Sequence, residues 1–246
     1  MAIKKIKILG VPVDVCPPQD FEKTIMDLLE KDGSKQIVFL SVWDLLKARG
    51  RNSYSECVRN ADLVIPISKS IISGAKFLKK EVPYRWNPFE TVINIMTVLE
   101  THYKSIYMLG GHKKTLMAAE KNVRNTFSNL QIVGRYVGYY PKSVEADVIS
   151  AIHKASPSLV LMSDGVRDKD CWFYNRRENF DHSIFLYFND VVDIFSERKT
   201  HVNKVVFEKG NEIWGEIMRN PLKIFLIFPF VWYKVCLVWY RLFVKE

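Results

Sequence analysis

Cysteines are few in this sequence, and none of them form a CxxC pair. Such scattering provides neither a structural zinc motif nor a disulfide framework. We therefore expect no metal site, and a reducing compartment such as the cytosol. The four cysteines spread over the 246 residues are Cys16, Cys57, Cys171 and Cys236.

The local motifs of well-known catalytic sites are also missing. The chain has no P-loop and no GxGxxG, HExxH or GxSxG pattern. Residues 168–170 have the DxD form with which many sugar-nucleotide enzymes hold a metal and a diphosphate, but a two-residue match in a charged stretch is more often a solvated loop. The sequence predicts no metal and no cofactor.

A long uncharged run is absent from the apolar C-terminal tail. The longest uncharged stretch of the tail, residues 224–233, has ten residues, whereas a membrane-spanning helix needs about twenty. Asn220 and Pro221 are a suitable cap and first residue for a helix. The tail is therefore predicted to be helical without crossing a bilayer.

The charges of the tail form a pattern of their own. At about 100° per residue, its four basic side chains fall within about 40° of one another, and its tryptophans suit the headgroup region of a membrane. This pattern is typical of a helix that lies on an anionic lipid surface. The alternative is a helix packed on the protein body or in an oligomer interface. The residues predicted to contact the membrane are Lys223, Trp232, Lys234, Trp239 and Arg241, with Lys245 completing the basic stripe.

What the sequence does contain is an ordinary globular composition with a basic balance. It is 48% hydrophobic, and 36 Lys and Arg residues against 27 Asp and Glu residues give a net charge of +9. Such a charge suits an anionic partner. Nucleic acid is the weakest candidate, because the basic residues are dispersed and no RNP-like or helix-turn-helix pattern occurs.

Short apolar runs alternate with segments of helical periodicity along most of the chain. This alternation predicts an α/β fold, Rossmann-like, with a mostly parallel sheet and helices on both faces. The expected strands cover 6–15, 37–40, 62–67, 105–109, 130–134, 159–163 and 184–188. The expected helices cover 19–31, 42–49, 68–80, 89–103, 114–127 and 144–155, besides the amphipathic tail.

Gly110 and Gly111 follow one of these strands and precede a helix. Glycines at such a turn allow backbone N–H groups at the helix N-terminus to approach a phosphate. A tight turn without a ligand is an equally good interpretation.

Several segments, taken in order, resemble the bacterial WecG/TagA/CpsF glycosyltransferases over essentially the whole chain. They are ILGVPVDV near the start, ADLVIP at 61–66, YMLGG at 107–111, LQIVGRYVGYYP at 130–141, Gly165 with Trp172, Asp193, and GNEIW…RNP at 210–221. The resemblance implies an inverting, metal-independent transfer of an N-acetylmannosamine-type sugar. The donor would be a UDP-sugar and the acceptor a polyprenyl-diphosphate-linked glycan. The resemblance also implies that the C-terminal appendage docks on the membrane.

Three short segments depart from the family pattern. Family members carry Asp-Gly after the ADLVIP strand, and that Asp is the favoured general base, but this chain has Ile67 and Ser68. The family's Thr-x-Asn reads 39–41 FLS here, and its Pro-Lys-Gln-Glu reads 167–170 RDKD. Since isoleucine cannot accept a proton, another carboxylate would have to serve if catalysis persists. Asp170, which stands where the family has Glu, Asp44 and Asp193 are the candidate catalytic residues.

The remaining candidates would bind substrate. They were chosen because they lie at strand ends, where an α/β sheet binds its ligands, or in the segments that resemble the family. They are Ser41, Ser68, Lys69, Ser70, Gly110, Gly111, Asp164, Gly165 and Glu212.

These observations predict a peripheral enzyme on the cytoplasmic face of a bacterial cell membrane, acting in cell-envelope polysaccharide or exopolysaccharide synthesis. Its partners would be a UDP-sugar, a lipid-linked glycan acceptor and an anionic membrane, with homo- or hetero-oligomerisation left open. Residues 1–195 would form the glycosyltransferase-like domain and residues 196–246 the appendage. The alternative is a catalytically inactive relative that acts as a membrane-bound partner or scaffold of an active glycosyltransferase.

Overall fold

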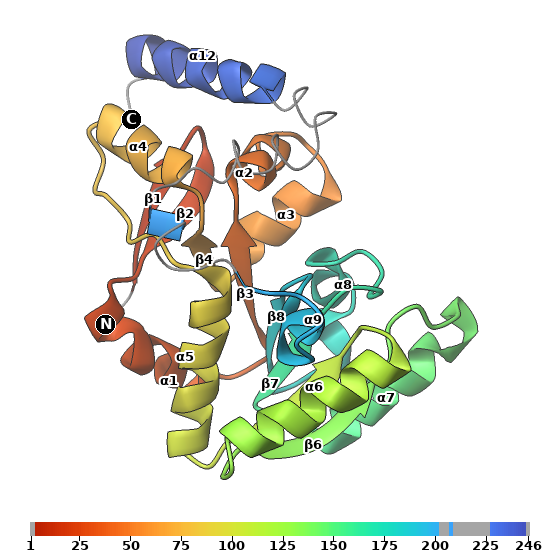
Figure 1. Ribbon diagram of the computed structural model, residues 1–246. Coiled ribbons are helices and arrows are strands. Elements are labelled where there is room, and N and C mark those ends of the chain that lie inside the picture. Colours follow the sequence, from red (N-terminus) through yellow and green to blue (C-terminus); the bar gives the residue numbers. More distant parts are fainter. Residues whose placement is uncertain (1–2, 202–206, 209–226, 245–246) are drawn as a thin grey trace.

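A parallel β-sheet forms the centre of the molecule. The computed structural model describes residues 3–201, 207–208 and 227–244. Within these residues six parallel strands lie in the order β4-β3-β8-β7-β5-β6, with helices on both faces (Figure 1). The predicted α/β, Rossmann-like fold is confirmed. The strands are β3 (Lys35–Leu40), β4 (Leu63–Pro66), β5 (Ser105–Leu109), β6 (Gln131–Tyr136), β7 (Leu159–Met162) and β8 (Ile184–Tyr187).

The alternation of side chains along each strand divides the core between two faces of the sheet. On β3, Ile37 and Phe39 join the cluster under α1, α5, α6 and α9, whereas Val38 and Leu40 join the cluster under α2, α3 and α4. A third cluster lies between the strands β5, β7 and β8 and the helices α7 and α8. The helix bounds are α1 (Phe21–Glu30), α2 (Val42–Ala48), α3 (Ser53–Asn60), α4 (Lys69–Phe77), α5 (Pro88–Thr101), α6 (Lys113–Thr126), α7 (Glu145–Ala155), α8 (Cys171–Tyr174) and α9 (Val191–Phe195).

The first predicted strand is wrong in one respect, because residues 6–15 do not form a single strand. β1 (Lys4–Ile8) and β2 (Val11–Val15) form an antiparallel hairpin outside the main sheet. The two residues between them, Leu9 and Gly10, have φ values of 52° and 80°, as a tight hairpin turn requires.

The hairpin covers the edge of the main sheet through a buried carboxylate. Asp14 on β2 accepts a hydrogen bond from the backbone N–H of Val64 at 2.6 Å. Because β4 is the outermost strand on that side, this contact satisfies one of its edge donors.

The remaining strand and helix predictions agree with the structure to within a few residues. Within the described residues, three short α-helices were not predicted. α3 begins after a cap at Asn52, whose side chain accepts from the Ser55 N–H at 2.9 Å, while α8 and α9 have four and five residues. Segments this short carry too little periodicity to be recognised.

The C-terminal helix α12 (Ile227–Phe243) packs across α2 and α4 (Figure 1). Its predicted start at Asn220 and Pro221 lies outside the described residues. None of the helices in the described part of the chain is long and apolar enough to cross a membrane.

Candidate functional site

The loops that follow the parallel strands meet at one edge of the sheet. Crevices at the carboxyl ends of parallel strands are the usual ligand sites of open α/β folds. Most of the predicted site residues stand in the loops or first helical turns after β3, β4, β5, β7 and β8. They form two groups, one beside the N-termini of α2 and α4 and one at the turn into α6.

The first group forms around the N-terminus of α2. Ser41 caps this helix, and Asp44 returns the contact by accepting from the Ser41 N–H at 3.2 Å. Ser68, in the loop before α4, accepts from the Val42 N–H at 3.1 Å. The structure therefore brings Ser41, Asp44 and Ser68 together, and it gives Asp44 a capping role.

Asp170 lies with these residues. Its surroundings shift the pKa of its carboxyl toward neutral pH. Burial, and then the negative charge of Asp44, raises the pKa of Asp170 to about 8. The residue nevertheless keeps an intermediate solvent exposure. A carboxyl that is enclosed but still reachable, with a pKa near neutrality, is suited to proton transfer.

Tyr54 on α3 is a further member of this group that the sequence did not indicate. It is 5% exposed, and its hydroxyl group has no hydrogen-bond partner among the described residues. Burial, and then the charges of Asp44 and Asp170, raise the pKa of Tyr54, which shows that the phenol lies near both carboxyl groups. Because α3 was not predicted, the sequence offered no signal for this placement.

The second group surrounds Gly110 and Gly111. Their N–H groups donate to the carbonyl oxygens of Tyr136 at 3.0 Å and of Asp164 at 2.8 Å, so neither is available to a phosphate. Gly110 has a φ of 128°, and a Cβ atom there would lie 2.9 Å from the backbone of Ser163. Close packing of the turn therefore explains the glycine, which is the simpler of the two interpretations left open by the sequence.

An exposed aromatic surface lies beside this turn. The rings of His112 and Tyr139 are stacked, with centroids 4.6 Å apart and planes 10° apart. The Tyr139 hydroxyl group donates to Asp164 at 2.7 Å, and Tyr139 is 59% exposed. Gly165 lies beneath the Tyr139 ring, since a Cβ atom on it would come within 2.5 Å of that ring. The sequence analysis included Tyr139 in a family segment but assigned it no role.

Asp193 lies near the second group. Its charge contributes to raising the pKa of Tyr139, after the hydrogen bond to Asp164 and burial. It also pairs with Arg198 at 3.8 Å. Of the three candidate catalytic residues, Asp44 and Asp170 therefore belong to the first group and Asp193 lies beside the second.

Tyr187 at the end of β8 connects the two groups. Its pKa is raised by burial and then by the charges of Asp170 and Asp164, which places one carboxyl of each group near the same phenol. Within the described residues, no cluster of three or more His, Cys, Asp or Glu side chains is arranged to hold a metal ion.

The position of the family's favoured base is apolar in this structure. The Ile67 N–H donates to the Leu40 carbonyl at 3.1 Å, and its side chain packs against the main core. Phe39 belongs to that core and is 7% exposed. Neither position supplies a group that could accept a proton.

Arg85 places a positive charge beside Ile67 and was not identified from the sequence. Its Nε donates to the Ile67 carbonyl at 3.0 Å and its Nη1 to the Phe207 carbonyl at 2.6 Å. Its guanidinium group also lies 3.7 Å from the centre of the Phe207 ring.

The remaining predicted residues lie on α4 and in the tail. Lys69 and Ser70 form the first turn of α4, and the Ser70 carbonyl accepts from the Tyr233 hydroxyl of α12 at 2.8 Å. Trp232 and Trp239 are 60% and 55% exposed. Lys234 is exposed as well, and Arg241 lies over the Phe77 ring at 4.6 Å. Glu212, Lys223 and Lys245 lie outside the described residues.

Comparison with known protein families gives one match that covers nearly the whole chain. The model described as "Glycosyl transferase WecG/TagA/CpsF family" matches residues 6–245.

Proposed function

The chain belongs to the WecG/TagA/CpsF glycosyltransferase family, and from this premise we propose that it transfers an N-acetylmannosamine-type sugar from a UDP-sugar to a polyprenyl-diphosphate-linked acceptor at a membrane surface. The family acts in cell-envelope polysaccharide synthesis with a nucleotide-sugar donor and a glycan acceptor. The sugar, the UDP group, the lipid linkage and the membrane are the parts that we add.

The observation that carries the proposal is the carboxyl group of Asp170. Its pKa of about 8 arises mainly from burial, and an ionised base of this strength accepts a proton readily near neutral pH. In the proposed step the acceptor hydroxyl group attacks the anomeric carbon from the face opposite the UDP group and gives its proton to Asp170. The bond from the anomeric carbon to the diphosphate breaks, and UDP leaves with the electron pair.

Two basic side chains lie near Ser41 and Ser68, and we propose that they stabilise the departing diphosphate. Arg85 stands beside Ile67, and Lys69 lies in the first turn of α4. A helix N-terminus and basic side chains stabilise developing negative charge. In this proposal the diphosphate lies near α4, and the uracil ring lies against the exposed pair of His112 and Tyr139 with Asp164 beside it.

The two faces of α12 support the membrane part of the proposal. Its inner face is buried against α2 and α4 through Tyr233, Cys236 and Leu237. At about 100° per residue the exposed apolar residues of the other face span an arc of about 140°. Lys234 and Arg241 adjoin one border of that arc. These exposed residues are Phe228, Val231, Trp232, Val235, Val238, Trp239, Leu242 and Phe243.

An apolar helical face with basic residues along its border matches a helix that lies in a lipid interface. The sequence analysis predicted that basic residues and two tryptophans of the tail contact the membrane. We now propose that the aromatic face enters the lipid and that the two basic side chains reach the phosphates from its border.

Vesicle sedimentation tests the membrane part. Wild type should sediment with vesicles that contain phosphatidylglycerol, and a Trp232→Glu, Trp239→Glu variant should remain largely in the supernatant. Tyr103→Glu is the control, because Tyr103 is 75% exposed in the turn after α5. Equal binding of all three proteins would exclude the exposed face of α12 as the membrane contact.

A transfer assay with UDP-N-acetylmannosamine and a lipid-linked acceptor tests the catalytic part. The apolar position of Ile67 favours one other candidate, a relative that binds the nucleotide without catalysis. Sugar transfer by wild type supports the enzyme, UDP binding without transfer supports the inactive relative, and the absence of UDP binding contradicts both.

A further inference from the structure

Asp170 stands in a loop whose backbone is unusual. The two residues before it, Asp168 and Lys169, have φ values of 57° and 50°, a conformation that costs free energy for residues other than glycine. Two consecutive residues in this region persist only where surrounding contacts hold them. The contacts that hold this loop therefore determine where Asp170 lies.

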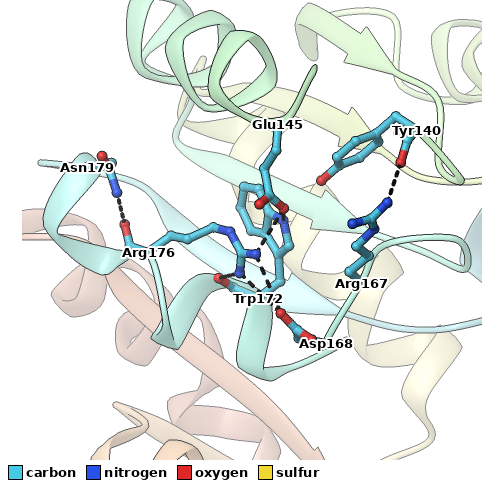
Figure 2. A network of polar contacts seen from close by, with 7 residues as sticks. All are labelled: Tyr140, Glu145, Arg167, Asp168, Trp172, Arg176 and Asn179. Atoms are coloured by element: carbon cyan, nitrogen blue, oxygen red, sulfur yellow. Dashed lines mark hydrogen bonds and ion pairs between the residues drawn. The ribbon is translucent and has the colours of Figure 1, made fainter. Parts of the chain in front are cut away.

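One arginine supplies several of the side-chain contacts around this loop. Figure 2 shows the guanidinium group of Arg176 among Glu145, Asp168 and Trp172. It donates to Glu145 Oε1 at 2.9 Å, to the Trp172 carbonyl at 2.9 Å and to Asp168 Oδ2 at 3.4 Å. The Arg176 and Glu145 side chains are only 16% and 14% exposed, so their ion pair is less weakened by solvent than a surface pair.

Glu145, the first residue of α7, connects that helix to the same loop. Its Oε1 atom accepts from the Trp172 indole at 3.2 Å as well as from Arg176 (Figure 2). Trp172 is fully buried. The pair thus joins α7, α8 and the left-handed turn at Asp168.

A second contact holds the backbone of Asp170. The buried amide of Gln36 on β3 donates to the Asp170 carbonyl at 2.7 Å. Asp170 is therefore held by Gln36 and, through the neighbouring residues 168 and 172, by Arg176.

We infer that Arg176, with Glu145 as its partner, is a positioning residue for the catalytic carboxyl of Asp170. Arg176 does not touch the substrate. It holds the Asp168 turn so that Asp170 stays enclosed near Asp44 at the edge of the sheet. The inference rests on the proposed function, in which Asp170 is the base.

The test combines kinetics with a measurement that needs no activity. Arg176→Gln should lower kcat about tenfold to a hundredfold with little change in KM, since a misplaced catalytic group can cost that much. Arg176→Lys should recover part of the loss. In an Asp170→Asn background the same Arg176→Gln change should have almost no further effect on kcat. Arg177→Gln is the matched control, because Arg177 lies over the Tyr174 ring on the neighbouring turn.

NMR titration of ¹³C-labelled aspartate gives the second readout. Asp170 should titrate near pH 8 in wild type and closer to the ordinary range of aspartate in Arg176→Gln. If Arg176→Gln does not fold, the double variant Glu145→Gln, Arg176→Gln replaces it, because it removes both charges and keeps an amide contact. The same kinetic and NMR measurements are then made on the double variant.

An unchanged Asp170 titration in the folded variant would overturn the inference, and so would equal losses of kcat in both backgrounds. A wild-type protein without transfer activity would contradict the proposed function, whereas the titration would still decide whether Arg176 controls Asp170.

Discussion

Asp44 lies close enough to Asp170 for its negative charge to raise the pKa of the Asp170 carboxyl, beyond the larger effect of burial. The two residues come from different parts of the sheet edge, one from the helix after β3 and one from the loop after β7. Their proximity gives the edge a carboxyl group that can carry or release a proton near neutral pH. This is the property that the apolar Ile67 position cannot provide.

The buried carboxyl of Asp14 should make stability depend on pH. Burial raises its pKa from 3.8 to about 6. Because the folded state binds the proton more tightly, this contribution to stability is complete below pH 3.8 and is lost as the pH rises through 6. The loss is about 3 kcal/mol.

Chemical denaturation at pH 4 and pH 7.5 measures the effect. The free energy of unfolding of Asp14→Asn, relative to that of wild type, should increase by about 2–3 kcal/mol at the higher pH, because wild type loses the contribution and the variant does not. Asp147→Asn, an exposed position on α7, is the control for removing one carboxylate. An Asp14→Asn variant with the same pH dependence as wild type would contradict the prediction.

Gly74 on α4 makes room for the docking of α12. A Cβ atom at this position would lie 2.2 Å from the Tyr233 hydroxyl. Gly74→Ala should therefore loosen α12 and cost about 1–3 kcal/mol of stability, as overpacking of a core does. Hydrogen exchange of the α12 amides and thermal unfolding measure the two effects.

A second substitution distinguishes a specific clash from a general loss. Tyr233→Phe alone should cost about 1 kcal/mol, because it removes the hydrogen bond to the Ser70 carbonyl. In the double variant with Gly74→Ala, the cost should be less than the sum of the single costs, because the clashing atom is gone. Strict additivity would show that the clash does not occur.

Of the two neighbouring thiols Cys57 and Cys171, Cys171 should have the lower pKa. Hydrogen bonding with Cys57 is the main cause that lowers the pKa of the Cys171 thiol, and the charge of Lys47 contributes. Cys57→Ala should therefore move the pH dependence of Cys171 alkylation to higher pH, as followed by mass spectrometry of iodoacetamide labelling. Cys16→Ala, at a separate buried thiol, should leave that dependence in place.

The sequence predicted the sheet well because buried parallel strands are short apolar runs, as in residues 105–109, which form β5 with the predicted bounds. It did not predict the hairpin, since Leu9 and Gly10 interrupt an apolar segment without a polar turn. Asp170 was selected through the family resemblance. Its raised pKa follows from burial and from Asp44, which lies 126 positions away, and no local pattern reports such a contact.

The stacked pair of His112 and Tyr139 is another contact that no local sequence pattern reports. Tyr139 was visible in the sequence as part of GYYP, but its stacking on His112 depends on the packing of two loops. The apolar tail was recognised in advance, whereas the side of it that packs on the body became clear only with Tyr233 and Gly74 in contact. The boundary between residues 195 and 196 stays a prediction from the sequence.

The central claim is that Asp170 is the base for sugar transfer, and a pH profile of the transfer rate tests it most directly. Wild-type kcat should rise with pH and level off above about pH 8, since the carboxylate is the active form of Asp170. Asp170→Asn should lower kcat by about 10²–10⁴-fold and abolish that rise. An Asp170→Asn enzyme with wild-type kcat and an unchanged pH profile would contradict the account.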